Sequence, residues 1–205
     1  MSIPESPFTV TDVEVAQTKV GYKGFFRLER LKLRHKLFRG GWSHWFHREL
    51  FVRGEAVAAI LYDPTSDQIG FIEQFRVGAL KEPYGPWCLE VVAGISEPGE
   101  SPAQVIVREI EEEAGVHDVE LLPICQYLSS PGGSDERLHL YCAVCDLTGA
   151  GGVFGLADEN EDIRLHLAPA AAVFTAMYTS RFNNAATLIC LQWLQINHAR
   201  LRSRS

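Results

Sequence analysis

The segment that most constrains this chain is GISEPGESPAQVIVREIEEEAG, an acidic stretch that runs from one glycine to another over residues 94–115. Ser101 and Pro102 form a typical helix start, because a capping hydroxyl group precedes a proline in the first turn. Gly115 is a typical helix stop. The segment therefore predicts a helix over residues 102–114 that follows a glycine-containing loop.

The predicted helix has two distinct faces. Apolar residues recur every four positions from Ile106 to Ala114 and form a stripe that can be buried. Glu109, Glu112 and Glu113 have i, i+3, i+4 spacing, so their carboxylates share another face. The sequence thus places three like charges beside one another on a single helix.

Two interpretations account for this carboxylate face. Two carboxylates about 6 Å apart repel by about 3 kcal/mol at an effective dielectric of about 20, whereas an exposed pair costs only about 0.2–0.5 kcal/mol. A solvated face, eased by Arg108, is therefore tolerable. The alternative is that divalent cations bridge the carboxylates to a phosphate-containing substrate, which would make the chain a hydrolase. Charge alone does not separate the two.

Composition argues against several other classes of function. The 205 residues are 46% hydrophobic, which allows one substantial core and a small accessory domain. A net charge of −7 and a pI near 5.5 argue against broad electrostatic binding to nucleic acid or to an anionic membrane. No secretory signal is recognisable at the start, and no apolar run reaches about 18 residues. We expect a cytoplasmic protein that binds neither nucleic acid nor membrane.

The five cysteines fit a cytoplasmic location, because an odd number at scattered positions suits reduced thiols better than a disulfide framework. Cys142 and Cys145 have the spacing of half a zinc site, but no second half is visible. They also lie in RLHLYCAVCDL, where apolar residues alternate as in a half-buried strand. We favour packing in a core over zinc binding.

Residues 1–50 differ in composition from the rest of the chain. They contain a basic and aromatic stretch, KGFFRLERLKLRHKLFRGGWSHWFHREL, with alternating apolar residues and a Gly-Gly turn. This stretch predicts an antiparallel β meander. A meander of this size is not stable alone, so we expect it to pack on the larger domain or on another subunit.

Residues 51–205 mix strand-like and helical patterns, which predicts a second and larger α/β domain. Strands are predicted at residues 55–63, 68–77, 87–94, 119–128, 137–147 and 163–168, and helices at residues 102–114, 169–178 and 184–200.

The last predicted helix has a cap and an apolar face. Asn183 or Asn184 is a suitable N-cap, and the apolar face runs from Leu188 to Ile196. We expect residues 199–205 to form a frayed, solvated tail.

The acidic segment also has a longer pattern. Glu100 follows Gly94 after five residues, and after seven more the chain reads Arg-Glu-Ile-x-Glu-Glu-x-Gly-Val at residues 108–116. These residues match every fixed position of the Nudix box, so the chain resembles the Nudix hydrolases, which cleave a nucleoside diphosphate linked to another moiety. The resemblance implies an α/β (α+β) fold. In it, residues 51–205 form an α/β/α sandwich with a mixed β-sheet, and residues 1–50 form a small antiparallel β domain.

Outside the box, the chain resembles the bacterial ADP-ribose pyrophosphatases over nearly its whole length. Pro131, sixteen residues after Gly115, matches the proline that marks ADP-sugar pyrophosphatases within the superfamily. The other matching stretches are GFF at 24–26, REL at 48–50, IEQFR at 72–76, LEVVAG at 89–94, SSPGGSDER at 129–137, GLADENEDIR at 155–164 and NNAATLICLQWLQ at 183–195.

The resemblance implies a metal site on the acidic helix. Glu109 and Glu113 match the main metal ligands of the family, and Glu112 matches a third contributor. The backbone carbonyl group of Ala93, just before the glycine, matches a further ligand. The implied cofactor is Mg²⁺, as two or three ions, with Mn²⁺ as a possible substitute. Arg108 and Glu100 match residues that brace the loop and helix.

The resemblance also implies a base and a substrate site. Glu159, in the acidic loop ADENED, matches the base that activates the attacking water, with Glu161 as the alternative or as a further metal contact. Arg76 matches a phosphate or ribose contact, and Glu136 matches a ribose contact. For the adenine the matching residues are Phe25 and Arg48, which we expect to come from the other subunit of a homodimer.

The implied activity is Mg²⁺-dependent hydrolysis of ADP-ribose to AMP and ribose 5-phosphate. One alternative keeps the fold but accepts a broader range of ADP-sugars or other nucleoside diphosphate derivatives. Residues 77–90 depart most from the expected pattern and lie near the distal sugar, so sugar preference is the least constrained property. A second alternative is a module that binds ADP-ribose without cleaving it. Such modules typically lose box carboxylates, and none is lost here.

Overall fold

The computed structural model describes residues 3–96, 99–156 and 160–203. The chain forms two compact units. The N-terminal unit consists of Met1–Gly54 and Leu128–Glu136, and the larger unit consists of Glu55–Tyr127 and Arg137–Ser205. The chain therefore leaves the N-terminal unit after residue 54 and returns to it once.

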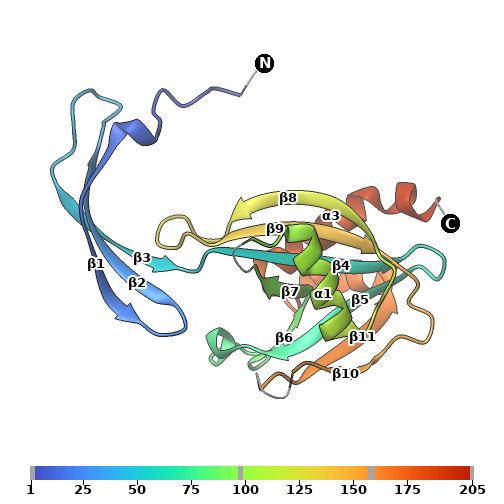
Figure 1. Cartoon of the computed structure of the whole chain (residues 1–205). Helices are drawn as coiled ribbons and strands as arrows, with labels where there is room; N and C mark the ends of the chain where they lie inside the picture. Colours follow the sequence, from blue (N-terminus) through green and yellow to red (C-terminus); the bar gives the residue numbers. More distant parts are fainter. Residues whose placement is uncertain (1–2, 97–98, 157–159, 204–205) are drawn as a thin grey trace. The chain divides into compact units, whose positions relative to one another are not determined.

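The N-terminal unit is a three-stranded antiparallel sheet in the order β1-β2-β3 (Figure 1). Its elements are η1 (Val10–Asp12), β1 (Val13–Lys23), β2 (Arg27–His35) and β3 (Phe46–Val52). None of the described residues of this unit is buried, so the sheet has no core of its own. The sequence did not single out β1, because polar side chains interrupt its apolar alternation.

The larger unit is built on an eight-stranded sheet in the order β10-β11-β5-β4-β9-β8, with β6 beside β5 and β7 beside β4. The sheet is mixed, because β4 and β9 run parallel whereas β4 and β5, and β5 and β11, run antiparallel. The strands are β4 (Glu55–Asp63), β5 (Gln68–Phe75), β6 (Trp87–Glu90), β7 (Val92–Ile95), β8 (Glu120–Leu128), β9 (Arg137–Val144), β10 (Gly152–Phe154) and β11 (Ile163–Pro169).

Helices cover both faces of this sheet (Figure 1). One face packs against α1 (Pro102–Ala114), and the other packs against α2 (Ala170–Ala176) and α3 (Ala185–Arg202). Short 3-10 helices occur at η2 (Val77–Ala79) and η4 (Met177–Thr179). Residues on alternate positions of β4 enter the two cores in turn, as expected for a strand buried on both faces. The predicted α/β/α sandwich with a mixed sheet and a small antiparallel sheet is confirmed.

The ends of α1 follow from its sequence. The Ser101 hydroxyl group accepts a hydrogen bond from the Gln104 backbone N–H, and the Gln104 side chain bonds back to the Ser101 backbone. Gly115 ends the helix in a left-handed conformation with φ 61°. The predicted helix over residues 102–114 is confirmed, and Ile106, Ile110 and Ala114 are buried as expected.

The predicted strand over residues 87–94 is in fact two strands separated at Val91. β6 pairs with β5, whereas β7 pairs with β4, so the chain crosses between neighbouring strands at this point. The Val91 backbone N–H donates to the buried Thr187 hydroxyl group in α3 at 3.1 Å. An interaction between distant segments thus interrupts an apolar run that looked continuous.

The C-terminal prediction was partly wrong. Asn184 is the N-cap of α3, and it is one of the two residues predicted for this position. The helix continues to Arg202 and Leu201 is buried, so the residues up to Arg202 are not a frayed tail. Ile196 is 83% exposed and lies outside the buried face.

Cys142 and Cys145 are both buried, but they enter different cores, which agrees with packing rather than with a shared metal ion. Among the described residues, no helix is both long and apolar enough to cross a lipid bilayer.

Candidate active site

Glu109 lies where α1 approaches the glycine loop most closely. Its carboxylate packs directly on Gly94, so a Cβ atom added to that glycine would overlap the carboxylate group. Burial raises the pKa of Glu109 to about 7, although the positive charge of Arg108 works in the opposite direction. Gly94 is therefore required because the glutamate occupies the space of a side chain.

Glu113 lies one turn further along α1 and is only 3% exposed. Its Oε2 atom accepts a hydrogen bond of 3.1 Å from the Ala93 backbone N–H. Burial raises the pKa of Glu113 to about 8, and the negative charges of Glu109 and Glu161 act in the same direction. The fold thus holds an acidic side chain in a place that disfavours its charged form.

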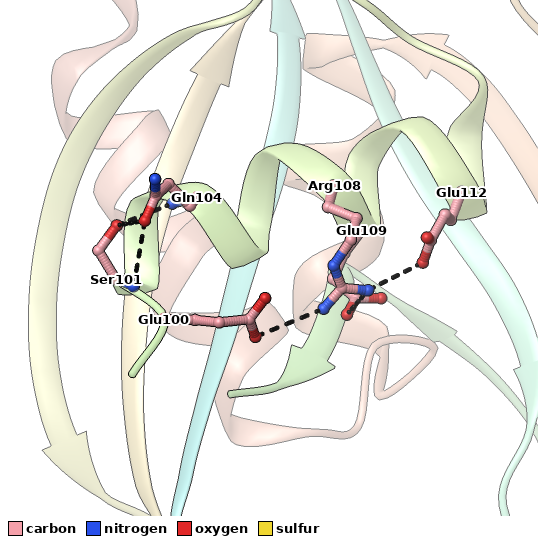
Figure 2. Close-up of polar contacts among 6 residues, drawn as sticks. All are labelled: Glu100, Ser101, Gln104, Arg108, Glu109 and Glu112. Atoms are coloured by element: carbon pink, nitrogen blue, oxygen red, sulfur yellow. Dashed lines mark hydrogen bonds and ion pairs between the residues drawn. The ribbon is translucent and has the colours of Figure 1, made fainter. Parts of the chain in front are cut away.

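Arg108 braces the start of the site (Figure 2). Its Nη1 atom lies 3.0 Å from Glu109 Oε1 and 3.0 Å from Glu112 Oε2, and its Nη2 atom lies 3.9 Å from Glu100 Oε2. Arg108 thus contacts Glu100, which lies just before the helix. Glu112 is engaged by Arg108 at the edge of the site.

The donor set has the chemistry of a site for a hard divalent cation. Its potential donors are the carboxylates of Glu109 and Glu113 and the carbonyl group of Ala93, and all of them are oxygen atoms, as Mg²⁺ prefers. Burial raises the pKa of both carboxylates in spite of the positive charges of Arg108 and Arg76, and a bound cation would offset this effect of burial. In the described ranges, however, no group of three or more acidic, His or Cys side chains is gathered as complete metal ligation requires. Mg²⁺ usually keeps several water molecules and binds substrate phosphates, so it does not require a complete set of protein ligands.

The acidic loop reaches the same place through Glu161. Its charge contributes to the raised pKa of both Glu109 and Glu113, so its carboxylate is within electrostatic reach of both. The Glu161 N–H donates to the Leu156 carbonyl group at 3.1 Å. Glu159, the first candidate for the base, lies outside the described residues.

Arg76 lies at the end of β5, beside the acidic helix. Its Nε atom donates to Glu90 Oε2 at 2.7 Å, and its side chain remains 41% exposed. Its positive charge is one of the influences that lower the pKa of Glu113 against the larger effect of burial. Arg76 and Glu161 are therefore both within electrostatic reach of Glu113, and Glu161 is also within electrostatic reach of Glu109.

The other predicted substrate residues belong to the N-terminal unit. Phe25 is 89% exposed and makes an edge contact with Phe26 at 4.7 Å between ring centroids. The Arg53 guanidinium group lies 4.3 Å from the Phe26 ring centroid, and its Nε atom donates to Glu136 at 2.6 Å. Phe25 and Glu136 are therefore joined through two intervening side chains.

Arg48 does not belong to that chain of contacts. Its guanidinium group lies over the Phe46 ring, 4.5 Å from the centroid, and donates to the His47 carbonyl group at 2.9 Å. Arg48 thus lies on β3, whereas Phe25 lies in the turn between β1 and β2.

The sequence analysis missed the buried carboxylate of Glu90. It also identified Asn184 only as a helix cap and missed its hydrogen bond to Glu90. Glu90 is 6% exposed and accepts hydrogen bonds from Arg76 and from the Asn184 side chain. The available signal was a single acidic residue within the apolar run WCLEVVAG. A lone charge in a buried strand requires a partner.

Comparison with known proteins identifies the family. A model of the NUDIX domain matches residues 52–183, which is more than half of the chain. The chain belongs to the NUDIX family. The matched residues include the acidic helix α1, the strands β4 to β11 and the helix α2.

Two relatives match nearly the whole chain. The ADP-ribose pyrophosphatase of Haemophilus influenzae is 42% identical over 198 residues, which cover 95% of this chain and 91% of that protein. The ADP-ribose pyrophosphatase of Escherichia coli (strain K12) is 42% identical over 196 residues, which cover 96% and 94%. A crystal structure described as an ADP compounds hydrolase superposes with a TM-score of 0.69 at 18% identity, covering 95% of this chain and 99% of that one. This last similarity supports the NUDIX fold.

Proposed function

We propose that this NUDIX protein hydrolyses the diphosphate bond of ADP-ribose and releases AMP and ribose 5-phosphate. The observation that carries the proposal is the half-buried Glu109 and the buried Glu113 beside Ala93, an arrangement of oxygen donors suited to a cation that binds phosphate. Similarity to two ADP-ribose pyrophosphatases along more than nine tenths of their lengths supports the choice of substrate.

The proposed metal ligands are Glu109, Glu113 and the Ala93 carbonyl group, with Glu112 as a further contributor. Two or three Mg²⁺ ions are the proposed cofactor, and Mn²⁺ is a possible substitute. When bound, these ions would neutralise the diphosphate and make a nearby water molecule more acidic. To bind a metal ion, Glu112 would have to give up its contact with Arg108.

The proposed base is Glu159, with Glu161 as the alternative. Either carboxylate would take a proton from the water that attacks one phosphorus atom in line with the leaving oxygen. The charge of Glu161 acts on both Glu109 and Glu113, which supports a role for this loop in the reaction.

Four residues are the proposed substrate contacts. Arg76 would bind the diphosphate, Glu136 would bind a ribose, and Phe25 and Arg48 would hold the adenine from the other subunit of a homodimer. The absence of buried residues among those described in the N-terminal unit supports a partner that covers its sheet. We expect the protein in the cytoplasm, with a nucleotide sugar as its small-molecule ligand and neither nucleic acid nor membrane as a partner.

A panel of substrates tests the proposal. The purified protein is incubated with Mg²⁺ and ADP-ribose, ADP-glucose, NADH or a diadenosine polyphosphate, and release of AMP is followed by chromatography. Preference for ADP-ribose supports the proposal, whereas equal rates on several members indicate the broader ADP-sugar pyrophosphatase. Tight binding of ADP-ribose without AMP release would identify a non-catalytic module instead.

A further inference from the structure

The strongest unassigned feature of the larger unit is a buried carboxylate at the point where its sheet separates. β4 and β5 pair with each other only over residues 61–63 and 68–70. Elsewhere β4 pairs with β7, and β5 pairs with β6. Glu90 is the last residue of β6 and lies at this crossing, with 6% of its surface exposed. A charged group in such a place is costly unless it is fully hydrogen-bonded.

Both carboxylate oxygens of Glu90 have partners. Oε2 accepts from Arg76 Nε at 2.7 Å, and Oε1 accepts from Asn184 Nδ2 at 2.6 Å. Asn184 is the N-cap of α3, and its Oδ1 atom accepts from the Thr187 N–H at 2.8 Å. Glu90 therefore connects the partly exposed side chain of Arg76 to the start of α3.

The same short segment reaches the acidic helix. The Val91 N–H donates to Thr187 Oγ1 at 3.1 Å, and the Ala93 N–H donates to Glu113 Oε2 at 3.1 Å. Residues 90–93 are thus fixed to α3 on one side and to α1 on the other. Arg76 and Glu113 are both held by this segment, which defines the position of one relative to the other.

The way in which Glu90 contacts Arg76 leaves part of the arginine available. A guanidinium group has five N–H donors in a planar fork, and Glu90 engages the one on Nε. The side chain is 41% exposed, and its terminal nitrogens can form a bidentate contact with phosphate oxygens. A held guanidinium group loses little conformational freedom on binding, which favours affinity.

We propose that Glu90 is a positioning residue that holds Arg76 by its Nε atom and so presents the terminal guanidinium nitrogens to the diphosphate of the substrate. The inference rests on the proposed function, since it assigns the diphosphate contact to Arg76. Glu90 itself touches no reacting atom.

A substitution cycle tests the proposal through KM and kcat for ADP-ribose. Glu90→Gln is expected to raise KM about tenfold with kcat changed less than about threefold, because a neutral oxygen holds the guanidinium group less firmly. In an Arg76→Ala background, Glu90→Gln is expected to change kcat/KM less than about twofold, because there is no guanidinium group left to position. An equal fold-change in both backgrounds would overturn the proposal.

A compensating substitution separates positioning from stability. In Glu90→Gln, the new amide donor faces the Asn184 amide donor. Adding Asn184→Asp supplies an acceptor for it and keeps the helix cap, since Asp also caps well. The double variant should regain thermal stability while KM stays raised. Recovery of KM together with stability would mean that Glu90 acts through folding alone. Glu73→Gln is the matched control and should leave KM unchanged. Glu73 lies on β5, and its half-buried carboxylate contacts His166 on β11 at 2.9 Å.

A spectroscopic measurement requires no substrate, so it distinguishes failure of this inference from failure of the proposed function. In the free protein labelled with ¹⁵N, the Arg76 Nε–H signal should be shifted downfield and protected from solvent exchange. It should lose both properties in Glu90→Gln. An unchanged signal would overturn the inference, whereas a wild-type protein that cleaves no ADP-ribose would contradict the proposed function only.

Discussion

At the scale of single residues, Glu113 combines near-complete burial with a position at the centre of the proposed cation site. Glu113→Gln keeps an oxygen that can accept from the Ala93 N–H, so the fold should be retained while a charged ligand is lost. We expect the Mg²⁺ concentration for half-maximal activity to rise by about 10- to 100-fold. Activity measured across a Mg²⁺ titration provides the test.

The matched control is Glu111→Gln on the same helix. Glu111 is exposed and its carboxylate lies 3.5 Å from the His117 side chain. It should show the Mg²⁺ dependence of the wild type. A normal Mg²⁺ requirement in Glu113→Gln would remove Glu113 from the ligand set.

The base is a second question at this scale. Glu159→Gln should lower kcat by at least about 100-fold, the usual contribution of a general base, while KM changes only a few-fold. Steady-state kinetics on ADP-ribose separate the two constants. If Glu159→Gln turns over normally and Glu161→Gln does not, the base is Glu161.

At the scale of elements, the approach between β7 and α1 depends on a glycine. Gly94→Ala would place a methyl group in the space of the Glu109 carboxylate, so that either the side chain or the helix must move. We expect loss of most activity with a smaller effect on the melting temperature, measured by assay and thermal denaturation. Gly21→Ala in β1, where an added Cβ would make only an ordinary contact, should be active. Full activity in Gly94→Ala would show that the close packing is dispensable.

A second element-scale prediction concerns the turn between β4 and β5. Burial alone would raise the pKa of Asp67. Hydrogen bonds from His198 and Tyr62, together with the charge of Arg202, instead bring that pKa below its ordinary value. The lengths are 2.6 Å to His198 Nε2, 3.0 Å to the Tyr62 hydroxyl group and 3.1 Å to Arg202 Nη1. This turn is therefore tied to α3 through one ionised carboxylate.

The sign of the pH effect follows from the lowered pKa. Asp67 stabilises the fold at pH values above its unfolded-state pKa, near 3.9, and this contribution is lost as the pH falls through the lower folded-state value. Asp67→Asn should therefore cost about 1 kcal/mol of unfolding free energy at pH 7 and less below about pH 4. Urea unfolding at several pH values measures this.

Asparagine tolerates the positive φ of 55° at position 67, so the backbone is preserved in that variant. Asp118→Asn is the control, because Asp118 is also at positive φ but exposed. Its effect should stay within about 0.5 kcal/mol at every pH. A pH-independent loss in Asp67→Asn would exclude the ionised carboxylate as the cause.

Local signals explain which elements could be predicted. The cap at Ser101, the stop at Gly115 and the stripe from Ile106 to Ala114 lie within one segment, and α1 was predicted to the residue. The break at Val91 could not be predicted in this way, because it depends on Thr187, almost a hundred residues away. The burial of Leu201 is also a tertiary effect, since the local sequence there is polar.

The same distinction between local and long-range signals applies to the site residues. Box spacing identified Glu109 and Glu113 because both lie on one helix, and the structure places them together. Glu90 was missed because its two partners, Arg76 and Asn184, come from other parts of the chain. Residues that act within one element are visible in a sequence, whereas residues that connect elements require coordinates.

At the scale of the whole molecule, the proposed homodimer would place Phe25 at the active site of the other subunit. A mixture of Phe25→Ala and Glu113→Gln proteins tests this exchange, provided that each variant alone is nearly inactive. A mixed dimer would contain one intact site, so random pairing should restore about a quarter of wild-type activity. Activity after unfolding and refolding the mixture gives the answer, and separately refolded variants are the control. No recovery would mean that each subunit uses its own Phe25.

The N-terminal unit is built from two separate segments of the chain, which affects how it forms during synthesis. Its sheet receives the Phe51 contact to Gly133 and the Arg53 contact to Glu136 only after residues 128–136 have been made. At a synthesis rate of about 5–20 residues per second, the second segment follows the first only after several seconds. During that time neither of these two contacts can form. Rapid overproduction should therefore favour inclusion bodies, and slower growth at lower temperature should favour recovery of native protein.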